Sequence, residues 1–462
     1  MTVEVKDYVI HEMQGDMMTP ISIFESLAGR KKVLFESSAK HEESGRYSFI
    51  ALNPIAELKG SKENYTYQFK NDEPQQEEGS VLDKLRNLMP IQNKSYPFSF
   101  FGGAIGYFGY DTAFYNEKIG EALEDELNMP DVHAYFYDTF IVFDHLAQKV
   151  SIVTVDLFQS GRTESEMTNC VKEIVEEIKQ GSLYTEEKAI SVKFEPTIEK
   201  ADFINMVEQA KSYIERGDIF QVVLSQRFKT DYTGNPFSLY RKLRTSNPSP
   251  YMFYLEFDDY TILGTSPESL VKVLDRKVTT NPIAGTKPRG KSKEEDLLLE
   301  QTLIQDEKEI AEHRMLVDLG RNDIGRVSKI GTVQVTKYMN IERYKHVMHI
   351  VSEVTGELNE DTHVLDVLTS CLPAGTVSGA PKIRAMQIVN ELEQVKRGVY
   401  AGAIGYVSVN GNMDLALAIR TMIVKDNKAY VQAGAGIVYD SIPESEYEET
   451  INKAKALLEV HR

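Results

Sequence analysis

The sequence predicts an α+β protein in which antiparallel strands are combined with long helices. Strand-like runs at 139–144 and 150–155 flank a short turn, and Asn410-Gly411 is the turn type that joins two adjacent antiparallel strands. Residues 164–180 instead place apolar side chains at helical spacing. The apolar face of that segment carries Met167, Val171, Ile174, Val175 and Ile178. Hairpins and amphipathic helices in one chain indicate the α+β class.

Two parts of the chain differ in pattern. Up to about residue 180, strand-like runs alternate with polar turns, as at 32–36, 47–52 and the charged loop or hairpin at 61–79. From Ile198 onward the pattern predicts longer elements: a helix at 203–216 ending at Gly217, a strand at 220–228, and a helix at 297–319 stopped near Gly320. Because 181–196 is polar and aperiodic, we predict an N-terminal region, 1–185, and a C-terminal domain, 196–462.

Composition limits the function before any motif is considered. The 462 residues carry a net charge of −18 with no basic stripe, which argues against a nucleic-acid partner. A small anionic substrate would therefore need local cations or a metal. Cys170 and Cys371 are the only cysteines, so a disulfide framework is not expected. No apolar run approaches the roughly 20 residues needed to span a bilayer, and Met1 to Met13 lacks a signal-peptide core. We expect a cytoplasmic protein that does not bind membranes.

The stretch from Ala433 to Thr450 joins a glycine run to an acidic helix start. Gly434 and Gly436 allow the backbone N–H groups of Ala433–Gly436 to approach a ligand closely. Ser441-Ile442-Pro443-Glu444 fits a capping box, which predicts that a helix starts there. Glu446 and Glu449 then share one helix face. The stretch is either an anion-binding loop beside a carboxylate site or a turn before an acidic first helical turn.

A second pair of acids lies in the helical segment 305–317. Glu309, Glu312 and Leu316 follow helical spacing, so these carboxylates border the apolar stripe. Oxygen ligands in small number are what Mg²⁺ uses when water and substrate complete its shell. The two acidic pairs together therefore indicate a Mg²⁺ site.

The turns near the C-terminus predict the strand register. Centring one hairpin on Asn410-Gly411 places Arg420 opposite Ala401, one residue from Tyr400. A second turn near 426–427 places Arg420 opposite Ala433. We therefore predict a three-stranded meander that brings Arg420 and Tyr400 to the glycine run. Its middle strand would present Asp414, Ala416, Ala418 and Arg420 on one face, either as a cavity wall or as a solvated surface.

Two further loops and one histidine are candidates for binding. The loops 281–290 and 373–382 combine glycine, proline and hydroxyl groups, and the second enters a helix, as anion sites do. The second loop lacks P-loop spacing, which disfavours ATP. His349 lies in a strand-like run, where histidine is more often structural than catalytic. Neither cysteine lies in a nucleophile motif, so we expect no glutaminase activity in this chain.

These segments, in this order, resemble the chorismate-utilising enzymes, and most closely the large components of anthranilate synthases. The resemblance runs from Phe35 nearly to the last residue and is densest over 217–454. The matching motifs are Asp218-Ile219-Phe220-Gln221, Pro282-Ile283-Ala284-Gly285-Thr286, Leu316-Val317-Asp318-Leu319-Gly320-Arg321-Asn322-Asp323 and Gly375-Thr376-Val377-Ser378-Gly379-Ala380-Pro381-Lys382. The resemblance implies layered antiparallel sheets flanked by helices.

The resemblance also implies roles for individual residues. Glu268 would assist departure of a ring hydroxyl, and His349 would transfer a proton when pyruvate is eliminated. Glu312 and Glu449 would bind Mg²⁺, with Glu309 and Glu446 close to them. The positions that match chorismate contacts are Gly285, Thr286, Thr376, Tyr400, Arg420, Gly434, Ala435 and Gly436. The positions that match a tryptophan-binding inhibitory site are Ser37, Pro250, Tyr251 and Met252.

Within the family, the resemblance implies conversion of chorismate and ammonia to anthranilate and pyruvate, the first step of tryptophan biosynthesis. Ammonia would come from a separate glutamine amidotransferase subunit, component II, and L-tryptophan would inhibit. Water-adding relatives carry lysine where this chain has Gln221, and glutamine cannot act as that base. Aminodeoxychorismate synthases often carry lysine at the position of Ala284. An aminodeoxychorismate synthase, on the p-aminobenzoate pathway, is the alternative enzyme. A non-catalytic tryptophan-binding subunit is a third possibility, but it would have lost at least one site residue.

Overall fold

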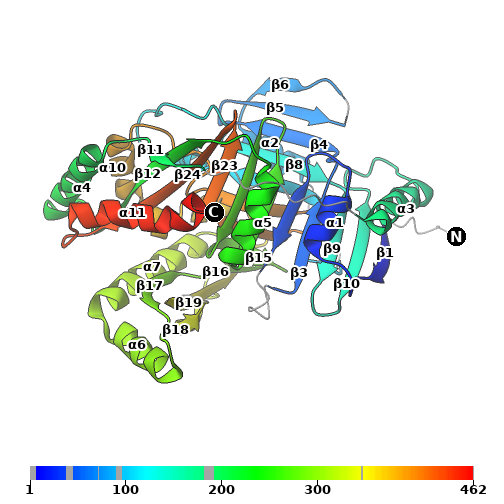
Figure 1. The fold of residues 1–462 in the computed structure, drawn as a ribbon. Coiled ribbons are helices and arrows are strands. Elements are labelled where there is room, and N and C mark those ends of the chain that lie inside the picture. Colours follow the sequence, from blue (N-terminus) through cyan, green and yellow to red (C-terminus); the bar gives the residue numbers. More distant parts are fainter. Residues whose placement is uncertain are drawn as a thin grey trace.

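The computed structural model describes residues 7–37, 45–70, 72–89, 96–181, 192–344 and 347–460. Within these ranges two 12-stranded sheets are flanked by helices, and neighbouring strands pair antiparallel throughout (Figure 1). The sheets and helices confirm the predicted α+β class with layered antiparallel sheets.

The first sheet joins strands from both ends of the chain. Its order is β1 (Tyr8–Gln14), β10 (Lys149–Val155), β9 (Thr139–Asp144), β3 (Tyr47–Ala51), β2 (Val33–Glu36), β13 (Tyr251–Glu256), β14 (Tyr260–Ser266), β23 (Thr421–Lys425), β24 (Lys428–Ile437), β12 (Gln221–Asp231) and β11 (Glu195–Pro196). The short strand β20 (Gly379–Ala380) also pairs with β12. The predicted strands at 139–144 and 150–155 are confirmed as β9 and β10.

The second sheet also combines strands from the N-terminal and C-terminal parts of the chain. Its order is β17 (Ile283–Pro288), β19 (Val347–Glu357), β16 (Lys277–Thr280), β15 (Ser269–Leu274), β22 (Met413–Leu417), β21 (Ala403–Ser408), β7 (Gly103–Phe108), β8 (Val132–Tyr137), β4 (Ala56–Gly60), β5 (Asn64–Phe69) and β6 (Gln75–Glu78), with β18 (Gln334–Arg343) on β19. The charged interval 61–79 contains the hairpin β5–β6.

Helices cover the outer faces of the sheets. They are α1 (Pro20–Ser26), α2 (Val81–Leu88), α3 (Glu164–Gln180), α4 (Lys200–Glu215), α5 (Pro236–Ser246), α6 (Lys293–Gln305), α7 (Glu307–Gly325), α8 (Val364–Cys371), α9 (Gly375–Ser378), α10 (Lys382–Leu392) and α11 (Pro443–Leu458), with a 3₁₀ turn at Tyr110–Tyr115. The largest apolar core lies between the sheets, and a second packs α1, α3, α5 and α11 on the first sheet. Alternate side chains of β9 enter each core, as strand geometry requires.

Strands of the N-terminal and C-terminal parts pair within both sheets. Phe35 of β2 lies opposite Phe253 of β13, and Gly106 of β7 lies opposite Gly405 of β21. The division into 1–185 and 196–462 therefore describes a change of sequence pattern, and its value as a domain boundary stays a prediction.

Two local predictions are wrong. The single helix expected at 297–319 is two helices, because Asp306 ends α6 and caps α7 by accepting hydrogen bonds from the backbone N–H groups of Lys308 and Glu309. The capping box at Ser441 does not form. The Ser441 hydroxyl accepts from the backbone N–H of Val438, and α11 begins after Ile442 without a side-chain cap.

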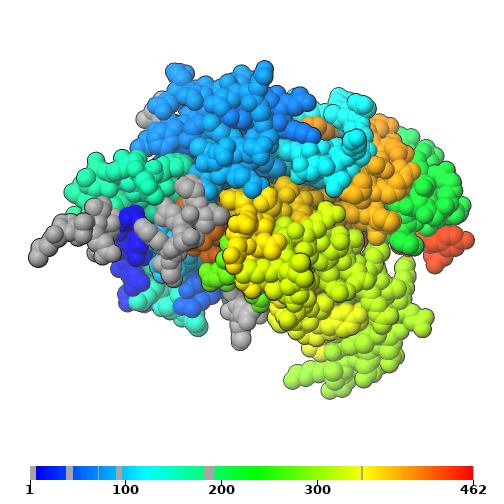
Figure 2. All heavy atoms as spheres, turned by 180° about the vertical axis from the view of Figure 1, so that it is seen from behind, coloured from blue at the N-terminus to red at the C-terminus, as the bar shows by residue number. Residues whose placement is uncertain are grey.

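Helices α6 and α7 with strands β17, β18 and β19 form a lobe. The lobe projects from the body of the molecule in both views (Figures 1 and 2). Its helix α7 packs on β17 and β19. This placement matters for function because the candidate site lies where the lobe meets α11 and the end of the first sheet.

Candidate active site

A cavity of about 600 Å³ lies between the lobe and the β12–β24–α11 layer. Thirteen of the fourteen residues predicted for catalysis, substrate and metal line it: Glu268, Gly285, Thr286, Glu309, Glu312, His349, Thr376, Tyr400, Arg420, Gly434, Gly436, Glu446 and Glu449. Ala435 does not line the cavity. It is fully buried in the apolar cluster of α4 and α10, because successive side chains of a strand point to opposite faces.

Arg420 reaches the cavity by a route that differs from the predicted meander. The pairs Ala403–Leu417 and Met422–Val431 extrapolate to Tyr400 and Ala433 opposite Arg420, so the two registers hold within one residue. However, β22 and β23 belong to different sheets, and the chain crosses between them at 418–420. Arg420 has a φ of 48° at this crossing. The three-stranded meander is therefore wrong.

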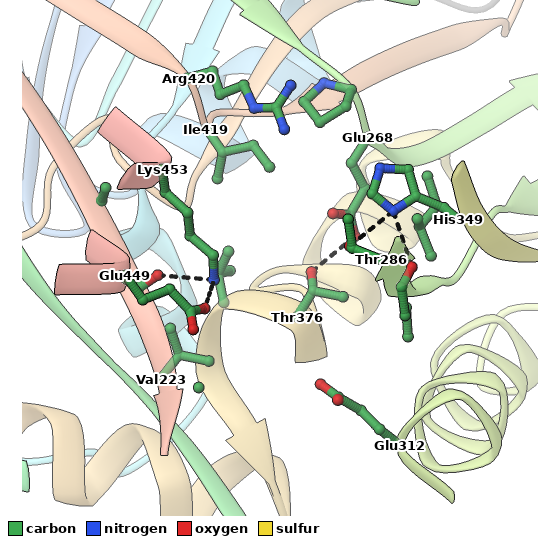
Figure 3. Close-up of a pocket in the computed structure, with 18 of the residues that line it drawn as sticks. Val223, Glu268, Thr286, Glu312, His349, Thr376, Ile419, Arg420, Glu449 and Lys453 are labelled. Atoms are coloured by element: carbon green, nitrogen blue, oxygen red, sulfur yellow. Dashed lines mark hydrogen bonds and ion pairs between the residues drawn. The ribbon is translucent and has the colours of Figure 1, made fainter. Parts of the chain in front are cut away.

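The crossing also divides the predicted common face of 414–420. Asp414 and Ala416 line a different, smaller cavity, whereas Arg420 lines the large one. Burial lowers the pKa of the Arg420 guanidinium, and the charge of Glu268 opposes that effect. The result is a largely buried cation facing the large cavity (Figure 3). Such a group suits a substrate carboxylate.

Glu268 is the proton-bearing acid of the site. It follows β14 and lies beside Thr376 at the start of α9, whose hydroxyl donates a 2.8 Å hydrogen bond to its Oε1. Burial raises the pKa of Glu268 to about 7, although Thr376 and the Arg420 charge both favour the carboxylate. A large share of Glu268 is therefore protonated at neutral pH, and the group can donate a proton.

His349 is held as a neutral base. Its Nδ1 lies 3.0 Å from the carbonyl oxygen of Gly285 and 3.0 Å from the hydroxyl of Thr286 (Figure 3). Because a carbonyl only accepts, this bond places the proton on Nδ1 and leaves the Nε2 lone pair available. Burial lowers the pKa of His349, and the charge of Arg420 lowers it further. His349 thus presents a neutral imidazole at the cavity wall, and its catalytic role stays a prediction.

Glycine is required at two cavity positions. Gly285 has a φ of 73° and lies at an irregularity in the β17–β19 pairing. At Gly434 a Cβ atom would lie 2.8 Å from the Tyr400 hydroxyl and 2.9 Å from the carbonyl oxygen of Leu224. Larger residues there would displace Tyr400 from the cavity wall.

The four acids face the cavity from two walls. Glu309 and Glu312 project from α7, and Glu446 and Glu449 from α11. Burial raises the pKa of Glu309, and the charge of Glu312 raises it further. Glu446 shows the same pattern, with Glu449 as its charged neighbour. A divalent cation would relieve this repulsion, and carboxylate oxygens are the donors that Mg²⁺ prefers.

The two acidic pairs do not meet. Figure 3 shows Glu312 and Glu449 on opposite sides of the cavity. Among the residues that the structure describes, no three histidine, cysteine or acidic side chains converge closely enough to hold an ion. The four carboxylates are the type of ligand that Mg²⁺ prefers. However, the two walls of the cavity would have to approach each other before both acidic pairs could bind one ion.

Three polar residues of the cavity lining, Lys308, Gln432 and Lys453, were not predicted from the sequence. Lys453 Nζ lies 2.7 Å from Glu449 Oε1 and donates a 3.2 Å hydrogen bond to the carbonyl of Gly434. Its i, i+4 spacing from Glu449 was a visible signal. Lys308 and Gln432 also line the cavity, and no pattern in the sequence distinguishes them. Gln221 donates a 3.1 Å hydrogen bond to Glu312 and so connects β12 to α7.

A second cavity of about 100 Å³ contains all four residues predicted for tryptophan. Ser37, Pro250, Tyr251 and Met252 lie at its wall with the aromatic rings of Tyr47 and Phe49. Tyr251 donates a 3.0 Å hydrogen bond to Asp414. The Ser37 hydroxyl is buried and has no hydrogen-bond partner among the described residues. This cavity can offer a free hydroxyl and a carboxylate to a small amphipathic ligand.

A helix that crosses a bilayer needs roughly 20 consecutive apolar residues. In the described ranges no helix is long and apolar enough to cross a bilayer.

The chain is similar to known proteins over nearly its whole length. The family model for chorismate binding enzymes matches residues 30–459. Similar proteins include anthranilate synthase component 1 of Acetivibrio thermocellus, 49% identical over 98% of this chain and 95% of the relative, and that of Lactococcus lactis, 46% identical over 98% and 99%. The crystal structure of anthranilate synthase component I from Streptococcus pneumoniae is 46% identical, with a TM-score of 0.83 over 97% of this chain and 99% of the other.

A more distant structure shares the fold alone. The menaquinone-specific isochorismate synthase of Escherichia coli is 18% identical, with a TM-score of 0.73 over 99% of this chain and 95% of the other. Fold, cavity and full-length similarity thus lead to one conclusion: the chain belongs to the chorismate binding enzyme family and, within it, to the anthranilate synthase component 1 proteins.

Proposed function

We propose that this protein is the synthase component of an anthranilate synthase, converting chorismate and ammonia to anthranilate, pyruvate and water. The observation that carries the proposal is the pairing of a protonated Glu268 with a neutral His349 across one cavity. One group donates a proton at neutral pH and the other accepts one, which is what the two steps of the reaction require. The names of the full-length relatives support the same activity.

The first step replaces the ring hydroxyl at C4 by an amine at C2. Ammonia forms a bond to C2, the ring double bonds shift, and the C4–O bond breaks. The Glu268 carboxyl gives its proton to the departing oxygen, which leaves as water. Gln221 at the cavity wall cannot deprotonate water, so it does not favour water as the nucleophile. Arg420 holds a substrate carboxylate throughout the step.

The second step removes the side chain as pyruvate. His349 Nε2 takes the proton from C2, the C3–O bond breaks, and the ring becomes aromatic. Enolpyruvate leaves and takes a proton at its methylene carbon to become pyruvate. Aromatisation favours this step, so a single positioned base suffices.

Mg²⁺ is part of the proposal. When bound, it would neutralise and orient a substrate carboxylate in a strongly acidic protein. Glu312 and Glu449 would hold it, with Glu309 and Glu446 next to them. Lys453 pairs with Glu449 in this structure, and would turn to the substrate or solvent when a cation takes that carboxylate.

Two partners complete the proposal. Ammonia is supplied by a separate glutamine amidotransferase component, since neither Cys170 nor Cys371 suits a nucleophile. Cys371 is buried, which raises the pKa of its thiol far above the range in which a thiolate forms. L-Tryptophan inhibits from the cavity at Ser37, where Asp414 and a hydroxyl that has no partner among the described residues offer polar contacts to its amino acid group.

One assay tests the activity and separates it from the alternative. The protein is incubated with chorismate, Mg²⁺ and ammonium at mildly alkaline pH, and anthranilate fluorescence and pyruvate are both measured. We expect both products in equal amounts. Consumption of chorismate without either product would instead identify an aminodeoxychorismate synthase. A folded protein that consumes no chorismate would point to a binding role alone.

A further inference from the structure

Arg397 lies directly behind three parts of the substrate cavity wall. It belongs to the segment between α10 and β21, and its side chain is 1% exposed. Arg397 does not line the cavity itself, whereas its contacts Val223, Val377 and Tyr400 do. The reaction described above assigns it no role. Arg397 can therefore act on the substrate only through the residues that it holds.

The guanidinium of Arg397 is shared among three acceptors. Its Nη1 donates a 2.7 Å hydrogen bond to the carbonyl oxygen of Val377 in α9, and its Nη2 donates a 2.7 Å bond to that of Val223 in β12. Nε and Nη2 also donate bonds of 2.8 and 2.7 Å to the carboxylate of Glu393 at the end of α10. Glu393 is held in turn by the backbone N–H and the hydroxyl of Ser225, at 2.8 and 2.9 Å. One buried group thus joins β12, α9 and α10.

The same guanidinium holds an aromatic ring of the cavity wall. Its central carbon lies 5.6 Å from the centroid of the Tyr400 ring and 4.7 Å from that of Tyr110. The attraction between a cation and an aromatic face is stronger away from water, and both rings are buried. At the other end of the ring, a Cβ at Gly434 would lie 2.8 Å from the Tyr400 hydroxyl. Arg397 and the missing Cβ of Gly434 therefore fix where Tyr400 meets the cavity.

Arg397 also anchors the helix that carries Thr376. Val377 follows Thr376 in α9, and Thr376 donates the 2.8 Å hydrogen bond to Glu268 at the cavity (Figure 3). α9 has four residues and no side-chain cap. Because a helix this short is not stable by itself, its position depends on contacts with its surroundings. The bond from Arg397 to Val377 is one of these contacts, so it supports the hydrogen bond that limits the pKa of Glu268.

Stability alone is a weak reason for the Arg397–Glu393 pair. The two side chains are 1% and 5% exposed, and removing both charges from water costs free energy. Well-packed apolar residues in place of a buried ion pair are often equally stable. Arginine offers what an apolar side chain lacks, a rigid plane of N–H donors that can meet several acceptors at set angles. Lysine has its donors on one atom and cannot reach Val223, Val377 and Glu393 together.

We infer that Arg397 is a positioning residue of the substrate cavity, an inference that rests on the proposed function. It holds Tyr400 where this residue meets the substrate. Through α9 it also holds Thr376 against Glu268. Such placement matters because an error of about 1 Å in a group at the site can lower the rate about 100-fold.

Arg397→Lys tests this role because it keeps the charge and removes the planar fork. We expect kcat/KM for chorismate to fall about 100-fold. Affinity for chorismate, measured by calorimetry with Mg²⁺ and without ammonium, should fall about tenfold, as for one lost hydrogen bond to a charged group. Arg162→Lys is the matched control, because Arg162 also pairs with a buried carboxylate, Asp138, and neither lines the cavity. If Arg397→Lys does not fold, R397M/E393Q takes its place, since it removes both charges and keeps an acceptor at position 393.

The pH profile separates positioning from stability. When Thr376 is held less firmly, its bond favours the Glu268 carboxylate less, and the acid stays protonated to higher pH. The alkaline limb of kcat should therefore move upward by roughly half a pH unit in Arg397→Lys. In the Thr376→Val background the same substitution should add no further shift, because both changes act through one hydrogen bond. Arg162→Lys should move neither the limb nor kcat/KM.

Each outcome decides the role of Arg397. A folded Arg397 variant with wild-type kcat/KM would overturn it. A loss of activity with an unmoved alkaline limb, or a shift that adds in full to that of Thr376→Val, would overturn it too. Wild type that binds chorismate but makes no anthranilate would overturn the proposed function. Calorimetry then decides for Arg397: unchanged affinity in the variant overturns the role, and a loss that spares Arg162→Lys supports it. Wild type that does not bind chorismate would overturn both.

Discussion

The hydroxyl of Thr376 donates a 2.8 Å hydrogen bond to the carboxyl group of Glu268 at the back of the substrate cavity. This bond favours the carboxylate, and it lowers a pKa that burial otherwise raises. The two effects leave the pKa of Glu268 at about 7, where a carboxylic acid can act as a proton donor under physiological conditions. Burial therefore raises the pKa of Glu268, and Thr376 limits the size of that rise.

Replacing Thr376 by valine should move the alkaline limb of the pH profile. Without the donated hydrogen bond the pKa of Glu268 rises, so the acid stays protonated to higher pH. We expect the alkaline limb of kcat to shift upward by about one pH unit, since one unit corresponds to about 1.4 kcal/mol. Thr376→Ser keeps the hydroxyl and should retain the wild-type profile. A downward shift would mean that Thr376 does not favour the carboxylate.

Glu268→Gln should abolish most activity because an amide cannot protonate the leaving hydroxyl. We expect kcat to fall by about 10²–10⁴-fold, measured as anthranilate fluorescence. Chorismate binding, followed by calorimetry, should change little, since the side chain keeps its shape. Activity close to wild type would remove Glu268 from the proton-transfer role.

The same substitution should stabilise the protein above neutral pH. The pKa of Glu268 in the folded chain, about 7, exceeds its ordinary value of 4.5. The group therefore contributes stability below pH 4.5, and this contribution is lost as the pH rises through 7. The amide introduced by Glu268→Gln cannot ionise, so the free energy of unfolding of the variant should exceed that of wild type by roughly 2–3 kcal/mol above pH 7. Urea titrations at pH 4 and pH 8 measure the difference, which should appear only at the higher pH.

Glu449→Gln should abolish Mg²⁺-dependent turnover while the fold remains intact. Glu449 faces the cavity, whereas the adjacent Glu448 pairs with Lys200 on the surface at 3.0 Å. Glu448→Gln is therefore the matched control, and it should behave as wild type. Direct Mg²⁺ titration in a calorimeter gives a readout that is independent of activity. Unchanged Mg²⁺ affinity in Glu449→Gln would remove this residue from the metal site.

Substitution of Ser37 should separate inhibition from catalysis. Ser37→Leu fills the second cavity, and we expect it to relieve inhibition by tryptophan at least tenfold. Ser37→Ala removes only the hydroxyl and should weaken inhibition by a smaller factor, about 1–2 kcal/mol of binding. Both variants should keep the wild-type KM for chorismate. Full inhibition of Ser37→Leu by tryptophan would place the inhibitor elsewhere.

Helices and strands were predicted well where a single local sequence pattern is strong. The helix at 164–180 follows from its apolar face and has the predicted bounds, and the hairpin strands predicted at 139–144 and 150–155 lie at Thr139–Asp144 and Lys149–Val155. The register around Asn410-Gly411 was correct to one residue. The break at Asp306 was missed because no glycine or proline marks the end of α6, although aspartate is a preferred N-cap residue.

The residues of the candidate site were predicted more completely than their arrangement in space. The spacing of Glu309 with Glu312, and of Glu446 with Glu449, placed each pair on one helix face. Nothing in that spacing shows that the pairs face each other across an open cavity, because each helix is positioned by its own packing.

Residues close together in the chain were enough to predict the class of fold, the two acidic helix faces and the glycine run, because each of these depends on local spacing. Only the tertiary structure shows that β22 and β23 belong to different sheets. That crossing places Arg420 at one cavity and Asp414 and Ala416 at the other. The pKa of Glu268 and the neutral state of His349 likewise depend on burial, which is created by contacts between segments far apart in the chain.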